Sequence, residues 1–252
     1  MPPIESYWND FLISFGRFTI ATMAIPVFVA IFYRKYWNKP LRIVFYYCLV
    51  TLFVNLFEQG VIWVSANRFH WIKDFIAYFK IQNTFFLLIL YYLKNFLLVG
   101  WFYSTLFPKN TFQRFIFPLS CILSVVALIN HCFIEGYHAP GNLNPVLEGV
   151  FLILLPLSYL WYSRSYSLRI PLKKNPYLWI SIGILLPELL SLFLDLTGDY
   201  IYARDFILYV KLYSASNVLD IIGNLFLSLG FFYGRYALFI PPDRNDPPTI
   251  GS

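Results

Sequence analysis

Seven apolar runs, each long enough to cross a lipid bilayer, constrain this chain more than any other feature of its sequence. A transmembrane helix needs about 20 mostly apolar residues to cross about 30 Å of hydrocarbon. The runs cover residues 11–33, 43–64, 83–107, 115–133, 145–162, 177–196 and 214–236. An open sheet cannot cross a bilayer, and the runs lack the alternation of barrel strands. The sequence therefore predicts an all-α membrane protein. Residues 1–240 are expected to form a single seven-helix transmembrane bundle, and residues 241–252 a disordered cytoplasmic tail.

The composition excludes an ordinary soluble domain. Hydrophobic residues make up 59% of the chain and charged residues 13%, whereas a soluble domain is about a quarter charged. The aromatic share of 21% fits lipid-facing Phe and belts of Tyr and Trp at the interfaces. The net charge of +6 does not indicate a nucleic-acid partner, because the basic residues lie in short loops between apolar runs. The expected partner is the lipid bilayer and its anionic surface.

The basic residues divide unevenly between the two sides of the predicted bundle. The loops after the first, third and fifth runs, together with the tail, hold Arg34, Lys35, Lys39, Arg42, Lys109, Arg114, Arg164, Arg169, Lys173, Lys174, Arg235 and Arg244. The other side holds Arg68, Lys73, Lys80, Arg204 and Lys211. The positive-inside rule then places the N-terminus outside and the C-terminus in the cytoplasm, as an odd number of spans requires. We expect a multi-pass protein of the cell inner (plasma) membrane.

Two loops on the outer side have the pattern of helices that lie in the membrane interface. Between the second and third runs, large apolar residues recur at helical spacing: Trp71, Ile72, Phe75, Ile76 and Phe79. An apolar stripe beside a charged face suits the headgroup boundary. Residues 205–213 have a similar pattern before the seventh run. The alternative is that the third and seventh helices simply begin earlier.

Charged side chains inside the runs are the main functional signal. They are Arg17, Glu58, Lys94, Glu148, Glu188 and Asp220. Each costs roughly 2.5–3.5 kcal/mol if it is unpaired in the bilayer, so each must find a partner, be neutralised or face water. Most of them fall in the outer half or the centre of their runs. We therefore expect one polar cavity that opens toward the outside.

Amide residues accompany these charges. Asn55 precedes Glu58 by one helical turn, and Asn217, Asp220 and Asn224 share one face at the spacing i, i+3, i+7. The functional interpretation is a ligand pocket or a proton path. The structural alternative is interhelical hydrogen bonding that fixes the order of the helices. Pro187 next to Glu188 is the most suggestive pair, because a proline frees a backbone carbonyl and kinks its helix beside a carboxylate.

Two further patterns have simpler explanations. His131, Glu135 and His138 have a spacing that could supply zinc ligands on one helical face. Gly136 and the following Pro140 indicate that the helix has already ended, so we expect no metal site and keep the three only as candidates. The residues of the motif 230–234 (GxxxG) predict close helix packing within the bundle or a homodimer contact.

Signatures of common enzymes are absent from the sequence. The chain has no glycine-rich phosphate loop, no HExxH and no GxSxG. We therefore expect a protein without catalytic residues or a cofactor.

The segments NPVLEGVFLILLPLSYLWYSRS, PYLWISIGILL and SNVLDIIGNLFLSLGFF give the chain a resemblance at the level of pattern over roughly residues 80–236. It resembles uncharacterised bacterial seven-helix membrane proteins, which are similar to the membrane modules found near or fused to sensory signalling proteins. The resemblance implies a sensory role but transfers no binding or catalytic residue. A separate signalling partner would then contact the cytoplasmic loops.

The sequence thus favours a non-enzymatic sensor or receptor-like membrane protein with an outward-facing polar cavity. A small-solute or proton-coupled transporter would use the same buried acids. An intramembrane enzyme is the third alternative.

Overall fold

The computed structural model describes residues 3–66, 84–107, 111–136, 141–165 and 171–239, and these residues form helices joined by short turns. Within these ranges, seven helices are long and apolar enough to cross a membrane. They run over Asp10–Phe32, Lys39–Val64, Phe85–Leu106, Phe112–Ile134, Leu143–Arg164, Pro176–Arg204 and Phe206–Ala237. Each corresponds to one apolar run of the sequence, so the prediction of an all-α protein with seven membrane-spanning helices is confirmed.

Three of the spans are single α-helices: α3 (Lys39–Ala66), α8 (Leu143–Ser165) and α9 (Pro176–Arg204). The first span divides into α1 (Pro3–Thr22) and α2 (Ala24–Phe32). The third consists of η2 (Phe85–Leu87), α5 (Leu88–Lys94), η3 (Asn95–Val99) and α6 (Gly100–Leu106). The fourth is α7 (Thr111–Ile129) with η4 (Asn130–Ile134), and the seventh is α10 (Phe206–Phe232) with η6 (Tyr233–Phe239).

Two interruptions lie beside the residues that matter for the interior of the bundle, and a proline explains the first of them. Pro26 has no N–H to donate to the carbonyl four residues earlier. Just before it, the chain makes a tighter turn, in which the Met23 N–H donates to the Ile20 carbonyl at 3.1 Å. In the third span, a π-helical turn begins at Asn95, directly after Lys94. Such turns are frequent at functional sites.

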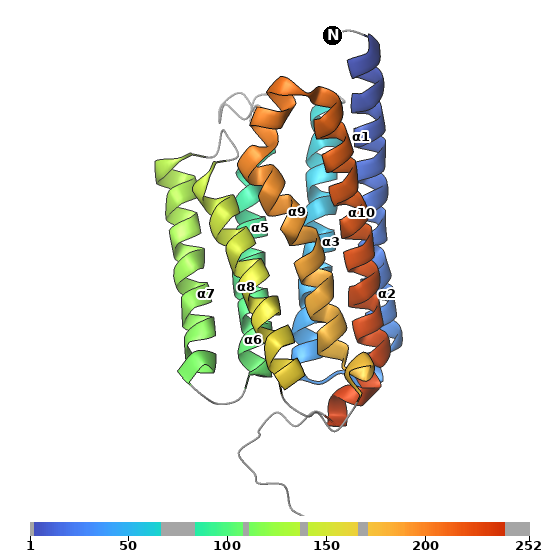
Figure 1. Ribbon diagram of the computed structural model, residues 1–252, viewed down its shortest axis with the longest axis vertical. Helices are drawn as coiled ribbons and strands as arrows, with labels where there is room; N and C mark the ends of the chain where they lie inside the picture. Colours follow the sequence, from blue (N-terminus) through green and yellow to red (C-terminus); the bar gives the residue numbers. More distant parts are fainter. Residues whose placement is uncertain (1–2, 67–83, 108–110, 137–140, 166–170, 240–252) are drawn as a thin grey trace, which may run out of the picture.

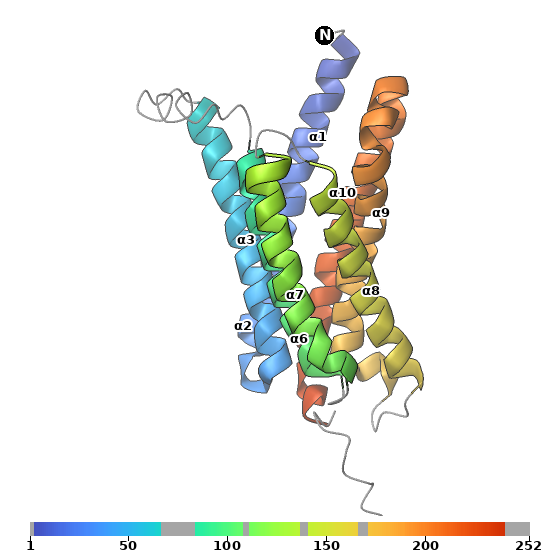
Figure 2. The same cartoon turned by 90° about the vertical axis from the view of Figure 1, so that its left-hand side faces the viewer.

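Six of the seven spans form a closed ring (Figures 1 and 2). α10 packs against α9, α1 and α2, and α2 packs against α3. α3 packs against the third span, the third span against α8, and α8 against α9, which completes the ring. α7 lies outside the ring, against α5, η3 and α6. The interior of the ring is therefore bounded by every span except the fourth.

The burial pattern is that of a bundle surrounded by lipid. Phe96 and Tyr103 are completely buried between the helices. By contrast, large apolar side chains project outward from the helices, such as Phe28 (71% exposed), Phe133 (82%) and Trp161 (78%). Water would make this outer surface unfavourable, whereas hydrocarbon chains cover it without cost. The exposed aromatic surface thus agrees with a protein embedded in a bilayer.

Glycines allow α9 and α10 to approach each other at backbone distance. A Cβ atom on Gly223 would lie 2.7 Å from the Gly183 carbonyl oxygen and 2.8 Å from Pro187 Cγ. Gly230 packs in the same way on Ile180 of α9, and a Cβ atom on Gly234 would lie 3.1 Å from Leu41 Cδ1. The motif at residues 230–234 therefore serves helix packing inside the bundle, which was one of its two interpretations.

Residues 205–213 do not form a separate interfacial helix. α10 is continuous from Phe206, and the Asp205 side chain caps it by accepting the Leu208 N–H at 2.9 Å. The expectation of an interfacial helix here is wrong, because a good N-cap at Asp205 lets the seventh helix begin earlier. The other predicted interfacial segment, residues 71–79, and the tail 241–252 lie outside the described residues.

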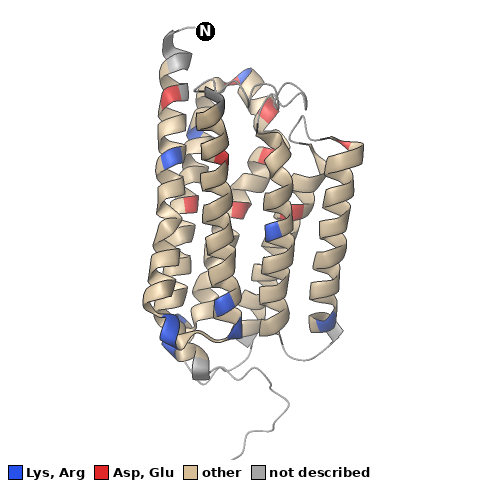
Figure 3. Ribbon diagram, turned by 180° about the vertical axis from the view of Figure 1, so that it is seen from behind, with Lys and Arg blue, Asp and Glu red and all other residues tan. Residues whose placement is uncertain are grey.

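Charge is distributed unevenly along the bundle (Figure 3). Most Lys and Arg residues gather at the end opposite the N-terminus, and most acids lie in the other half or near the middle. The basic end carries the connections that follow the first, third and fifth spans, including Arg34, Lys35, Lys173 and Lys174. The orientation of this asymmetry in a membrane stays a prediction.

Candidate functional site

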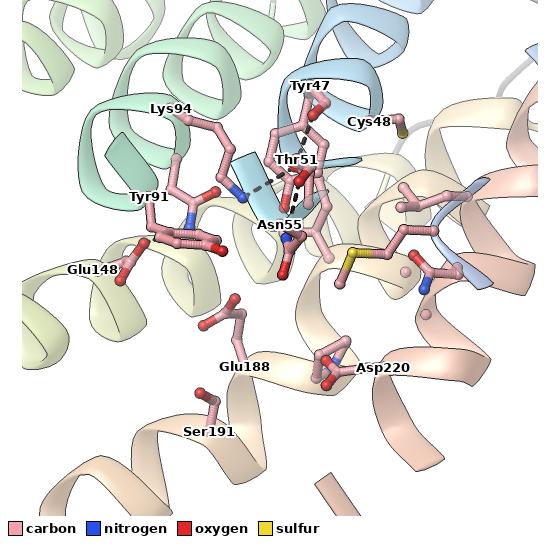
Figure 4. Close-up of a pocket in the computed structure, with 18 of the residues that line it drawn as sticks. Tyr47, Cys48, Thr51, Asn55, Tyr91, Lys94, Glu148, Glu188, Ser191 and Asp220 are labelled. Atoms are coloured by element: carbon pink, nitrogen blue, oxygen red, sulfur yellow. Dashed lines mark hydrogen bonds between the residues drawn. The ribbon is translucent and has the colours of Figure 1, made fainter. Parts of the chain in front are cut away.

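A cavity of about 520 Å³ lies inside the ring of helices. Its lining residues come from the first span, α3, α5, η3, α8, α9 and α10, and α7 contributes none of them. Its volume falls in the range of about 300–1,000 Å³ that is typical of small-molecule sites. The charged residues that line it are Glu58, Lys94, Glu148, Glu188, Asp195 and Asp220. Figure 4 shows several of them around the central space.

Lys94 occupies the wall formed by α3 and α5, with only 7% of its surface exposed. Its Nζ donates a hydrogen bond to Thr51 Oγ1 at 3.0 Å. The same nitrogen lies 5.0 Å from the ring centroid of Tyr47 and 5.4 Å from that of Tyr91. A hydroxyl and two aromatic faces thus stabilise the ammonium, the second by cation–π attraction. The Asn55 amide donates to the Thr51 carbonyl at 2.9 Å and completes this wall (Figure 4).

Glu148 of α8 is held in place by Asn95, the residue directly after Lys94. The Asn95 Nδ2 donates a short hydrogen bond to Glu148 Oε1. Asn95 also lines the cavity and is 7% exposed, and its Oδ1 is buried without a hydrogen-bond partner among the residues that the structure describes. The π-helical turn that starts at Asn95 therefore coincides with the contact between the third span and α8.

Glu58 connects α3 to the beginning of the third span through hydrogen bonds. Its two carboxylate oxygens accept hydrogen bonds from Thr84 Oγ1 at 2.6 Å and from the Tyr91 hydroxyl at 2.8 Å. Hydrogen bonds to an ionised group are roughly twice as strong as neutral ones. This carboxylate therefore has a structural role in addition to its place on the cavity wall.

Glu188 of α9 and Asp220 of α10 form the opposite wall. Figure 4 shows both side chains directed into the space that separates them from Lys94 and Asn55. In the part of the chain that the structure describes, neither carboxylate accepts a protein hydrogen bond. Both lie within electrostatic reach of the Lys94 ammonium. Asp195, one of the same lining residues, is exposed.

The cavity extends from the middle of the bundle toward the end where α9 joins α10. Glu188 and Asp220 lie near the centres of their helices, whereas Asp195 and Tyr213 lie closer to the α9–α10 connection. Tyr213 is 39% exposed. The exposed lining residues are thus on the side of the bundle that carries the N-terminus and few basic residues (Figures 1 and 3).

The structure brings together most of the residues that the sequence singled out. The cavity is lined by Asn55, Glu58, Lys94, Glu148, Glu188, Asp220 and Asn224. Two candidates are not lining residues. Arg17 is exposed on α1, and the amide of buried Asn217 donates to the Tyr213 carbonyl of its own helix at 3.0 Å. Asn224, which does line the cavity, donates to Thr22 Oγ1 at 3.0 Å and connects α10 to the first span.

The sequence analysis identified Asn55 and Asn224 but missed the other uncharged polar residues of the site. Asn95, Thr51 and four tyrosines at positions 47, 91, 92 and 213 all line the cavity. Tyrosine is common at the ends of membrane helices, so these residues gave no distinct signal in the sequence. The position of Asn95 directly after the mid-span Lys94 was the one feature that could have indicated it.

The candidate metal ligands at the C-terminal end of the fourth span have a different role. Glu135 accepts hydrogen bonds from the backbone N–H groups of Asn142 (3.1 Å) and Leu143 (3.0 Å) and from the Asn130 amide (2.6 Å). It therefore caps the N-terminus of α8. Burial alone would raise the pKa of this carboxyl, but the three hydrogen bonds hold the pKa below its ordinary value.

His131 is buried beside Tyr92, and His138 lies outside the described residues. Within the ranges that the structure covers, no group of three His, Cys, Asp or Glu side chains is arranged to hold a metal ion. The spacing of His131 and Glu135 is thus explained by packing and helix capping.

Comparison with known proteins adds no family to this picture, because no family model, curated protein or solved structure matches the chain. The fold and the cavity define it as a seven-helix membrane protein with a polar interior site.

Proposed function

We propose that this protein is a receptor-like sensor that binds a small ligand in the cavity between its six ring-forming spans. The observation that carries the proposal is how the charged side chains of the cavity are bonded. Lys94 contacts a hydroxyl and two aromatic rings, and the carboxylates of Glu188 and Asp220 accept no hydrogen bond within the described residues. Charges that served only to fix helix order would be expected to bond across the helix interfaces.

Only some of the charged cavity residues fit the alternative that they serve to hold neighbouring helices together. Glu58 and Glu148 do bond to neighbouring spans, through Tyr91 and Asn95. Glu188 and Asp220 instead leave their acceptor capacity directed into the cavity (Figure 4). Both side chains are half-buried, so their oxygens can accept hydrogen bonds from a molecule in the cavity. A ligand that donates hydrogen bonds to these groups would use that capacity, which supports a binding role.

The α9–α10 contact offers a route from ligand binding to helix movement. Pro187 removes the N–H that would bond to the Gly183 carbonyl, and that carbonyl faces Gly223 on α10. Glu188 follows Pro187 directly, so a ligand that engages its carboxylate acts next to the weakest point of α9. A ligand shifts such an equilibrium only by its difference in affinity for the two arrangements.

The predicted orientation places the cavity opening and the basic connections on opposite sides of the membrane. With the N-terminus outside, the cavity opens outward, and the basic connections lie in the cytoplasm. A protein partner there would detect the change, in keeping with the resemblance to sensory modules. The same orientation supports the inner membrane as the location.

A thermal-stability screen of the purified protein against small molecules tests this function. A ligand that binds the native state raises the melting temperature by mass action. We expect a specific hit that is lost in Glu188→Gln or Asp220→Asn. The matched control is Asp199→Asn, because Asp199 is an exposed acid of α9 outside the cavity lining and its variant should keep the hit.

The same hit distinguishes a sensor from a transporter. Liposomes that contain the pure protein should not accumulate the ligand if the protein is a receptor. Uptake that depends on Glu188 would favour the transporter instead, and the absence of any cavity-dependent hit would contradict both.

A further inference from the structure

From the cavity, whose role as a binding site rests on the proposed function, we infer that the ligand is a small organic cation that carries a protonated amine. The first argument is charge balance. The lining includes five carboxylates, those of Glu58, Glu148, Glu188, Asp195 and Asp220, and one ammonium, that of Lys94. A cation can therefore pair with several acidic groups here, whereas an anion would find one basic partner, Lys94, which already bonds to Thr51.

The second argument is an acceptor that the protein leaves unused. Asn95 lines the cavity and is more than nine-tenths buried, and its Oδ1 has no hydrogen-bond partner in the described part of the chain. The Asn95 Nδ2 already donates to Glu148, and the remaining amide oxygen is an acceptor. An ammonium group carries donors and no acceptor. It is the complement of an unpaired amide oxygen beside a carboxylate.

The third argument is that one cation already occupies this environment. The Lys94 ammonium is stabilised by the Thr51 hydroxyl and by the faces of Tyr47 and Tyr91. The wall around it is thus satisfied without a carboxylate of its own. Within the described ranges, Glu188 and Asp220 on the opposite wall accept no hydrogen bond. Tyr213 on α10 adds a further aromatic lining residue there. Carboxylates beside aromatic rings are the usual environment for a bound amine.

The cavity also sets the size of this cation. A volume of about 520 Å³ is far larger than a bare metal ion needs. Within the described residues, no cluster of three metal-ligating side chains occurs in or near the cavity. The geometry therefore points to an organic amine whose apolar part contacts Met23, Leu88 and Leu227 of the lining.

Matched pairs of amines and alcohols test the inference. Phenethylamine is compared with 2-phenylethanol, and putrescine with 1,4-butanediol, at equal concentration and ionic strength, with sodium chloride as the salt control. We expect at least one amine to raise the melting temperature of the full-length protein by about 3–6 °C near tenfold saturation, with no shift for its alcohol. Glu188→Gln and Asp220→Asn should each weaken the amine's apparent affinity at least tenfold, and Asp199→Asn should leave it unchanged.

The other outcomes separate this inference from the proposed function. If no amine exceeds its alcohol, the inference is overturned. If, at the same time, neutral or anionic compounds shift the melting temperature through Glu188 or Asp220, the binding role of the cavity stands and only the ligand class is wrong. If an amine binds but all three variants respond equally, the amine acts outside the cavity, and the inference is again overturned.

Discussion

At the scale of single residues, the polar atoms of the cavity fall into two groups. Some are joined to neighbouring helices, such as Glu58 to Thr84 and Tyr91. Others, such as Glu188 and Asp220, face the cavity without a protein hydrogen bond among the described residues. Composition and spacing could identify the charged members because a charge inside an apolar run is rare. Composition and spacing could not show which charged residues bond to a neighbouring helix and which face the cavity, because that depends on which helices become neighbours.

Tyr91→Phe tests the first group. Loss of the hydroxyl removes a hydrogen bond to a carboxylate, so we expect a loss of about 1.5–3 kcal/mol in the free energy of unfolding. Tyr46→Phe is the control, because Tyr46 is 45% exposed on the same bundle, and it should change stability by less than about 0.5 kcal/mol. Thermal unfolding in one detergent measures both. Equal stability of the two variants would contradict the assigned role of Glu58.

Glu135 gives a pH-dependent prediction outside the membrane spans. Hydrogen bonds from Asn130, Asn142 and Leu143 hold its pKa in the folded protein below the ordinary value. A group whose pKa is lowered by folding contributes stability above its unfolded pKa, about 4.3 for Glu, and loses it as the pH falls through the folded pKa. Glu135→Gln should therefore melt below wild type at neutral pH, and the difference should shrink below about pH 4.3. A difference that stays constant with pH would show that the charge has no such role.

At the scale of helices, the seven spans could be predicted because length and hydropathy determine them almost alone. Their ends were less predictable. The seventh helix begins at Phe206 because Asp205 caps it, and a single N-cap outweighed the amphipathic pattern of the segment. The π-helical turn at Asn95 was also not predictable, because nothing in its composition differs from an α-helical turn. The neighbours of each helix could not be derived, since every span is apolar on most of its surface.

Gly223→Ala tests the contact between α9 and α10. The new Cβ atom would meet the Gly183 carbonyl oxygen at 2.7 Å, and a backbone atom cannot move aside as a flexible side chain can. Overpacking of this kind costs about 1–3 kcal/mol. Gly198→Ala is the matched control on α9, because its Cβ atom would meet only Tyr209 Cε2 at the ordinary distance of 3.7 Å. We expect a lower melting temperature for the first variant and no decrease for the second. Similar values would contradict the close helix approach.

At the scale of the whole molecule, the ring of six spans creates a site that no single helix contains. The outward opening of that site depends on the orientation inferred from the basic residues. Cysteine labelling tests it in a background without Cys48, Cys121 and Cys132. Ala203→Cys and Lys173→Cys place thiols at exposed positions on opposite ends of the bundle. A membrane-impermeant maleimide should label the first on intact cells and the second only after lysis. The reverse pattern would place the cavity opening in the cytoplasm.

The central claim is that Glu188 and Asp220 serve a ligand and not the fold. The most direct measurement is the melting temperature of the ligand-free protein with Glu188→Gln or Asp220→Asn, beside Asp199→Asn. If these carboxyl groups are kept for binding, their replacement by amides removes acidic groups that accept no hydrogen bond among the described residues. We then expect melting temperatures equal to or above wild type, with gains of up to about 0.5–2 kcal/mol in the free energy of unfolding, and no change for the control. A loss of more than about 2 kcal/mol in both variants would show that the two acids hold the helices together and would contradict the claim.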